Sequence, residues 1–137
     1  MTEFKISEAA ALLGVSDDTV RRWGETGKLR IRKAESGLQV VDGVDLVPVM
    51  RDAAVGSPIG TAFPHARASA RNRLTGVITA VTRDGVMAQV ELQAGPFRIV
   101  SLMSREAADE LRLEPGMLAV ASVKATVVVV EVPEEPA

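Results

Sequence analysis

The chain has 137 residues, of which 47% are hydrophobic and 25% are charged, and its formal net charge is −2 at pH 7. This balance is typical of a globular protein with one average domain or two small ones, and it provides no whole-molecule basic field for binding nucleic acid. The absence of cysteine and the single histidine exclude disulfides, thiolate metal sites, cysteine nucleophiles and histidine-rich metal sites. No apolar run reaches the ~20 residues of a membrane span and no signal peptide is visible, so we expect a cytoplasmic location.

The first residues predict two short helices joined by a turn. In "SEAAALLG", Ser7 is a candidate N-cap and Gly14 a candidate C-cap. A second helix begins at Ser16, with two acidic residues in its first turn that favour the helix dipole. Gly24 and Gly27 are expected to end it.

Val20 and Trp23 are three residues apart and share one face of the second helix, where Trp23 is the candidate core anchor.

A hairpin and a third helix follow. The residues over 29–41 alternate around a Gly-containing turn and predict a β-hairpin. A helix is expected from Asp42, and Pro48 is expected to shorten or kink it.

The pattern changes after residue 54. The segment "VGSPIGTAFPHAR" contains two glycines and two prolines and predicts a linker over 55–68. Beyond it, apolar residues alternate with period two, and a hairpin turn is expected at Asp84–Gly85. "PFRIVSLM" predicts a third strand, a short helix follows Ser104, and "MLAVASVKATVVVVEV" predicts one or two final strands.

The fold class expected from these elements is α+β. Residues 1–54 are predicted to form a winged helix-turn-helix domain. Five short strands with one helix over 69–132 predict a small β-barrel of OB-like topology. The tail at 133–137 is expected to be disordered.

Basic residues gather around the second helix and the hairpin. Between residues 16 and 33 there are six basic and three acidic residues, which gives a local charge of +3 in an acidic chain. Such a patch can neutralise phosphates of double-stranded DNA while the second helix offers side chains to the major groove. The predicted DNA contacts are Ser16, Asp18, Thr19, Arg21 and Arg22 from the helix, with Lys28, Arg30, Arg32 and Lys33 from the hairpin facing phosphates or the minor groove. The alternative interpretation is a solvated face whose arginines only maintain solubility.

The stretch "ISEAAALLGVSDDTVRRWGETGKL" resembles the opening of MerR-type and excisionase-type DNA-binding domains. Those domains pair a helix-turn-helix with a small β-wing, and the resemblance covers roughly the first fifty residues. The chain departs from the MerR pattern because no long coiled-coil helix follows the wing. Two acidic residues at the start of the recognition helix oppose the approach of phosphate, so binding as a dimer or higher oligomer is expected.

Three motifs in the second half, "SARNRLTGVI", "MSREAADELRLEPG" and "VKATVVVV", resemble the molybdate-binding Mop domain of the TOBE superfamily. The resemblance spans about 69–132 and implies a small OB-like barrel that self-associates and holds an oxyanion, molybdate or tungstate, at subunit interfaces. The residues that it implies are Ser69, Ala70 through its backbone, Arg71, Ser104 where the family usually has Thr, Lys124, Ala125 and Thr126.

The chemistry of these residues suits an oxyanion. Molybdate is a tetrahedral dianion with acceptors only, so its site needs fixed cations and several N–H or O–H donors. Period two along the last strand predicts that Ser122, Lys124 and Thr126 share one face, and an N-cap hydroxyl at Ser104 lies beside free backbone N–H groups. The alternative interpretation is that Arg71 and Lys124 are exposed strand charges and Ser104 only caps its helix.

Together the halves predict an effector-controlled transcription regulator in which oxyanion binding is linked to DNA binding. Two alternatives stay open: a molybdate storage or buffering protein of the molbindin kind, and an architectural DNA-binding protein that uses the barrel only for assembly. Single-stranded nucleic acid is disfavoured because Phe97 is the only aromatic residue beyond the linker. An enzyme is not expected, since the sequence contains no nucleophile–base pair, metal-ligand spacing or phosphate-binding loop.

Overall fold

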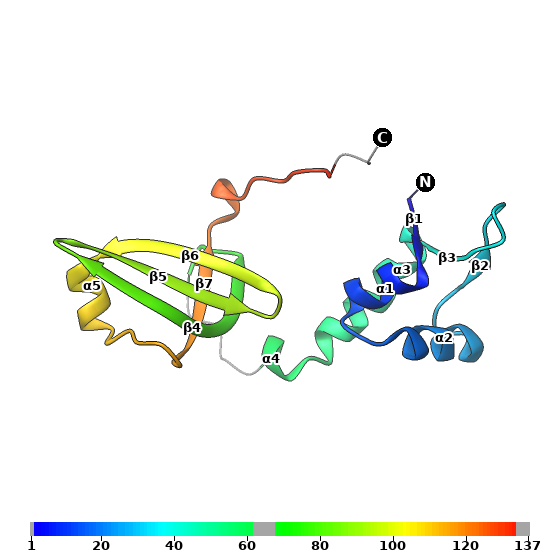
Figure 1. Ribbon diagram of the computed structural model, residues 1–137, viewed down its shortest axis with the longest axis horizontal. Helices are drawn as coiled ribbons and strands as arrows, with labels where there is room; N and C mark the ends of the chain where they lie inside the picture. Colours follow the sequence, from blue (N-terminus) through cyan, green and yellow to red (C-terminus); the bar gives the residue numbers. More distant parts are fainter. Residues whose placement is uncertain (1, 62–67, 134–137) are drawn as a thin grey trace. The chain divides into compact units, whose positions relative to one another are not determined.

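The computed structural model describes residues 2–61 and 68–133 (Figure 1). It divides into two compact units, Met1–Pro64 and His65–Ala137, which we describe separately. No helix in the described ranges is both long enough and apolar enough to cross a membrane. Positions 62–67 of the predicted linker and 134–137 of the predicted tail lie outside the described residues.

The first unit combines helices with a three-stranded antiparallel sheet in the order β1-β3-β2. Its elements are β1 (Glu3–Lys5), α1 (Ile6–Leu13), α2 (Asp17–Thr26), β2 (Arg32–Lys33), β3 (Gln39–Asp42), α3 (Gly43–Val55) and α4 (Pro58–Thr61). The buried core is drawn from α1, α2, β3, α3 and the loop before β2, and it consists of Ile6, Ala9, Ala10, Val20, Leu29, Val41, Leu46 and Val49. Trp23 packs against this core, as its spacing from Val20 predicts.

Local signals explain most helix boundaries of the first unit. Gly14 caps α1 in the left-handed conformation at φ 71°, and the Ser16 hydroxyl accepts a hydrogen bond from the Thr19 N–H at 3.1 Å. The prediction of Ser7 as N-cap is wrong, because α1 begins at Ile6 with Lys5 as its N-cap. The Glu8 carboxylate accepts the Lys5 N–H at 3.0 Å, which satisfies a backbone group at a helix start two residues earlier than predicted.

Two helix predictions are corrected by packing. Gly24 lies inside α2, which runs on to Thr26 with Gly27 as its left-handed C-cap. A Cβ at Gly24 would lie 2.4 Å from Ile31 Cδ1, so glycine there admits the following chain to the helix surface. Pro48 lies inside α3 and does not shorten it, because Leu46 and Val49 on the buried face hold the helix to the core on both sides of the proline. The helix therefore extends to Val55, and α4 occupies part of the predicted linker.

The predicted hairpin over 29–41 is present, with a short first strand. The Ala34 N–H donates to the Leu38 carbonyl at 2.8 Å, and Gly37 takes a φ of 87° in the turn. Strand β1, which the sequence analysis did not predict, pairs with β3 in the register Phe4↔Val41. The hairpin is thus fastened to the N-terminal segment of the same unit.

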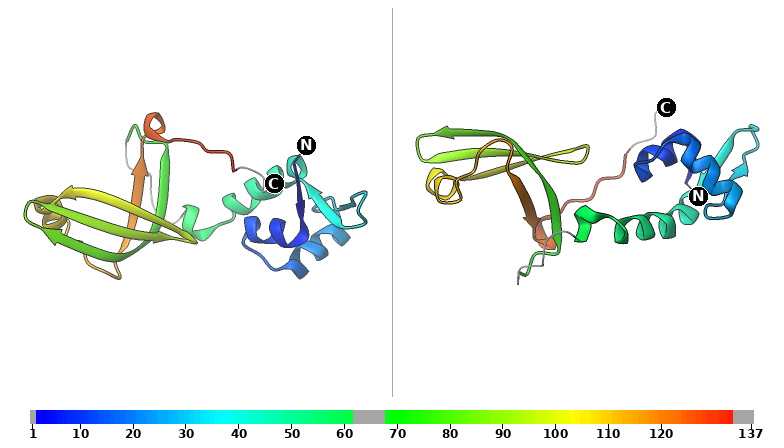
Figure 2. Two further views of the ribbon diagram at one scale, coloured as in Figure 1. Left: turned by 45° about the horizontal axis from the view of Figure 1, so that its top comes forward. Right: turned by 90° about the horizontal axis from the view of Figure 1, so that it is seen from below.

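The second unit is a four-stranded antiparallel sheet in the order β6-β5-β4-β7. Its elements are β4 (Asn72–Asp84), β5 (Met87–Ala94), β6 (Phe97–Ser104), α5 (Arg105–Glu110), β7 (Leu118–Val123) and the 3₁₀ helix η1 (Ala125–Val127). The hairpin at Asp84–Gly85 is confirmed, with Asp84 opposite Met87. Strand β4 pairs with β7 through its first part and with β5 through its last part, and Figure 2 shows its curved course.

Two expectations for this unit are corrected. The sheet is not a closed barrel: β6 and β7 lie at its two edges and do not pair with each other within the described ranges. The last strand ends at Val123, so the predicted alternation of Ser122, Lys124 and Thr126 along one strand is wrong. Val123 pairs with Asn72, the first residue of β4, and beyond that position the ladder has no partner.

Candidate oxyanion site and nucleic-acid interface

The first and third motifs of the second unit meet at one end of the β4–β7 ladder. Asn72 lies opposite Val123, and the Asn72 Nδ2 donates to the Val123 carbonyl at 3.0 Å. Directly opposite residues of antiparallel strands are about 5 Å apart. Arg71 directly precedes Asn72 and Lys124 directly follows Val123, so both residues lie just beyond the last pair of the ladder. The fold therefore brings together two cations that are separated by about fifty positions in sequence.

The polar groups at this end suit an anion. Arg71 and Lys124 are exposed, and neither makes an ion pair with any described residue. The Arg71 Nη1 donates to the carbonyls of Ala68 and Ser69 at 3.2 and 3.4 Å, which leaves its other N–H groups available. Ser69 is exposed as well, and two cations with a hydroxyl and no paired carboxylate are what a tetrahedral dianion requires.

The backbone after Lys124 does not continue as the expected strand. Lys124 is the N-cap of η1, and Ala125 and Thr126 form its first turn. Thr126 is exposed, so its hydroxyl is accessible at the same end of the sheet as Lys124. Ala70 is half-buried beside the start of β4 and can contribute only its backbone groups.

Ser104 does not join this cluster within one copy of the chain. It lies opposite Met87, which in turn lies opposite Asp84 at the far end of β4. From Asn72 to Asp84 a strand path at about 3.3 Å per residue spans about 40 Å. As predicted, Ser104 is an N-cap, and its Oγ accepts the Ala107 N–H at 3.1 Å. A site that contains both Ser104 and Arg71 therefore needs two copies.

The residues predicted to contact DNA from α2 divide into two groups. Ser16 and Thr19 form the helix cap, with their hydroxyl oxygens 2.9 Å apart. Arg21 pairs with Asp18 at 3.3 Å across one helical turn, and both side chains remain largely exposed. Arg22 is exposed and makes no ion pair in the described part of the chain, so it is the least encumbered cation of this helix.

The cations of the hairpin also differ among themselves. The Lys28 Nζ lies 4.1 Å from the centroid of the Trp23 ring, which positions the ammonium over the end of α2. Arg30 and Lys33 are exposed and make no ion pair with described residues. They remain available to phosphate, as the sequence predicts for this group.

Arg32 has a structural role that the sequence did not reveal. Its Nε and Nη2 donate to the two carboxylate oxygens of Asp42 at 3.0 and 2.8 Å, and Nη2 also donates to Glu3. The hydrogen bond to Asp42, followed by that to Glu3, raises the pKa of Arg32, and Arg32 lowers the pKa of Asp42. The guanidinium thus joins β2 to β3 and β1, and no local signal predicts this because β1 itself was not predicted.

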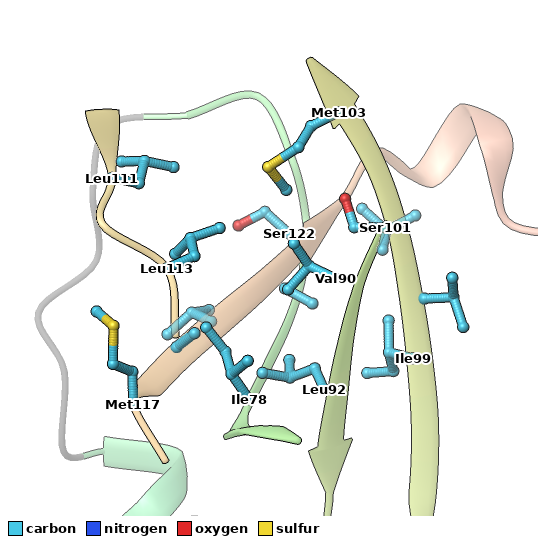
Figure 3. Close-up of a pocket in the computed structure, with 15 residues that line it drawn as sticks. Ile78, Val90, Leu92, Ile99, Ser101, Met103, Leu111, Leu113, Met117 and Ser122 are labelled. Carbon is cyan, nitrogen blue, oxygen red and sulfur yellow. The ribbon is translucent and has the colours of Figure 1, made fainter. Parts of the chain in front are cut away.

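An apolar cavity of about 530 Å³ lies on the face of the sheet that carries the small core of the second unit (Figure 3). Side chains of four strands and of the connection after α5 line it, among them Ile78, Val90, Ile99, Met103, Leu113 and Met117. Ser101 of β6 and Ser122 of β7 also border it. Because β6 and β7 do not pair, the cavity opens between the two edges of the sheet.

Comparison with known protein families matches each unit separately. Residues 5–38 match the MerR family of regulatory proteins, and residues 68–130 match the TOBE domain. The chain joins a MerR-family helix-turn-helix to a TOBE domain of the Mop type. Both resemblances seen in the sequence are thereby confirmed. Neither family is a family of enzymes, in agreement with the expected absence of catalysis.

Three solved structures resemble the TOBE half of the chain. A molybdate-binding protein from Sporomusa ovata is 27% identical, with 48% of this chain and 98% of that chain covered and a TM-score of 0.47. MopII from Clostridium pasteurianum is 35% identical, with 47% and 98% covered and a TM-score of 0.45. The cytoplasmic molybdate-binding protein ModG, with molybdate bound, is 40% identical, with 50% and 49% covered and a TM-score of 0.47. No curated protein matches the chain.

Proposed function

We propose that this protein is a transcriptional regulator that binds double-stranded DNA and responds to molybdate or tungstate. The observation that carries the proposal is the meeting of Arg71 and Lys124 at the open end of the β4–β7 ladder, on a chain that also contains a MerR-family unit. Two relatives of the TOBE half are described as molybdate-binding, which supports the choice of ligand. The description of ModG as cytoplasmic supports the same location for this chain.

The proposed oxyanion site lies between copies of the chain. One side of the proposed site consists of four side chains and of backbone groups of Ala70 and Ala125. The four side chains are those of Ser69, Arg71, Lys124 and Thr126. Ser104 lies at the other end of the same sheet, so it reaches the ligand only from a second copy. The ligand then stabilises one arrangement of copies, and a homo-oligomer is part of the proposal.

The proposed DNA interface uses α2 and the hairpin. Arg22, Lys28, Arg30 and Lys33 supply phosphate contacts, while Ser16, Asp18, Thr19 and Arg21 occupy the part of α2 that faces base edges. Arg32 supports this surface by holding the hairpin to β1 and β3. If the oxyanion changes the arrangement of copies, DNA must change oxyanion affinity by the same factor.

The ligand assignment is tested by titrating molybdate, tungstate and sulfate into wild type, Arg71→Ala and Lys124→Ala in a calorimeter. Loss of one charge-assisted contact removes about 1.5–3 kcal/mol, so each variant is expected to bind molybdate about 10- to 150-fold more weakly. Arg98→Ala, a variant of a cation already paired with Glu91 on the same sheet, is the matched control and keeps full affinity. Equal binding by all four proteins contradicts the site, and equal binding of sulfate contradicts the ligand.

The regulatory assignment is tested by footprinting genomic DNA fragments with and without molybdate. A sequence-specific footprint whose affinity changes with molybdate is the expected result. Molybdate binding without any specific footprint in either condition would favour the storage or buffering protein. A footprint without molybdate binding would favour the architectural protein.

A further inference from the structure

One acidic side chain of α2 lies where the phosphates of DNA would repel it. The Asp18 side chain is 96% exposed in the first turn of the helix. The N-terminal residues of a recognition helix contact base edges, so this carboxylate would enter a groove that is bordered by negative charge. Asp17, in the same turn, already provides a carboxylate that favours the helix dipole. Stabilisation of the helix start therefore does not require Asp18.

Asp18 is joined to Arg21 by a contact that leaves hydrogen-bonding groups of both side chains free. The Arg21 Nη1 donates to the Asp18 Oδ1 at 3.3 Å across one helical turn. The Arg21 Nε and Nη2 and the Asp18 Oδ2 form no hydrogen bond with any described residue. Nε and Nη2 together form one fork of the guanidinium, the arrangement that binds two acceptors at once. The two side chains thus present two donors beside one acceptor.

The major-groove edges of the base pairs differ in the order of their acceptors and donors. From guanine to cytosine, a G·C pair presents the acceptors N7 and O6 and then the donor N4. From adenine to thymine, an A·T pair presents the acceptor N7, the donor N6 and then the acceptor O4. Two protein donors followed by one acceptor complement the G·C order at all three positions. Against the A·T order, a donor meets N6 and the carboxylate meets O4, which gives two mismatches.

We propose that Asp18 is a specificity-determining residue, which reads one G·C base pair together with Arg21. Arg21 donates through Nε and Nη2 to N7 and O6 of the guanine, and the Asp18 Oδ2 accepts from N4 of the paired cytosine. The ion pair directs both side chains to one base pair and offsets the repulsion between the carboxylate and the phosphates. The inference rests on the proposed DNA binding, and it names one position of the sequence that the protein selects.

Selection from a pool of random duplexes tests the assignment, with the full chain and with molybdate present and absent. Wild type is expected to select sites with a fixed G·C position. In Asp18→Asn an amide replaces the carboxylate, and discrimination at that position should fall by about 5- to 150-fold because an amide also donates. Arg21→Ala should lose the same position. Both variants should keep the other positions of the site, which separates loss of one base contact from unfolding.

Asp17→Asn is the matched control, because it removes the same charge from the same turn at a half-buried position. It should select the same sequences as wild type. If Asp18 contacts no base, Asp18→Asn will bind all duplexes more tightly and select the wild-type sequences. That result, or wild-type sites without a fixed G·C position, overturns the inference while the DNA-binding function stands. Selection of no sequence by wild type in either condition overturns the proposed regulator and the inference with it.

Discussion

Among the described glycines of the TOBE domain, Gly76 is the one where an added methyl group would meet the closest neighbouring atoms. It is buried in β4, opposite Ala119 of β7. A Cβ at this position would lie 2.3 Å from the Gln93 carbonyl oxygen, 2.8 Å from the Gln93 carbonyl carbon and 3.1 Å from the Ala94 Cα. All three are backbone atoms of β5, so no side chain can rotate to make room. Gly76→Ala must therefore move β4 away from the end of β5.

The size of the effect follows from the overlap. Ordinary Cβ contacts begin at 3.4 Å, so the nearest atom is about 1 Å too close. Overpacking of this kind costs typically about 1–3 kcal/mol, and we expect about 3 kcal/mol because the obstacle is backbone. In a domain of 60–100 residues, 1 kcal/mol shifts the melting temperature by about 4–8 °C. Gly76→Ala should therefore melt about 12–24 °C below wild type.

The assay is thermal unfolding of the full chain measured by calorimetry. A second glycine provides the matched control. Gly56 has an ordinary φ of −79°, and a Cβ there meets the Asp52 carbonyl oxygen at a normal 3.6 Å. Gly56→Ala should be neutral or should stabilise its unit by up to about 1 kcal/mol. A melting temperature of the Gly76→Ala unit within about 2 °C of wild type would refute the close approach of β4 and β5.

Three further predictions concern single contacts. Arg32 lowers the pKa of Asp42. The stability that this pair adds is therefore present above the ordinary carboxyl pKa of about 3.9, and it is lost as the pH falls through the lowered value. The stability difference between wild type and Asp42→Asn, measured by thermal melts, should shrink toward zero in strong acid. Ser104→Ala removes the cap of α5 and should destabilise the TOBE domain by about 1 kcal/mol in urea unfolding, whereas Ser104→Thr should cost much less. Lys28→Ala should weaken DNA binding and lower the slope of log affinity against log salt by about 1, while Trp23→Phe, which keeps a ring beneath the ammonium, should leave that slope unchanged.

Short-range signals in the sequence were sufficient for much of the fold. The C-cap at Gly14, the helix start at Ser16, the N-cap at Ser104 and the turn at Asp84–Gly85 were all predicted and are confirmed. Each depends on dihedral angles or hydrogen bonds among residues a few positions apart. The order of the motifs also identified both families, because motif residues and their spacing are properties of the sequence itself.

The arrangement of distant segments was decided only by the tertiary structure. Neither the pairing of β1 with β3 nor the ion pairs that this pairing gives Arg32 has a local signature, since the partners lie far apart in the chain. The ladder between β4 and β7 ends at Val123, and this limit converted an expected strand at Lys124 into a turn. The length of β4, from Asn72 to Asp84, also places Ser104 at the opposite end of the sheet from Arg71. The sequence alone therefore predicted which residues have the chemistry to hold an oxyanion, and the sheet register placed Ser104 at the opposite end of the sheet from Arg71 and Lys124.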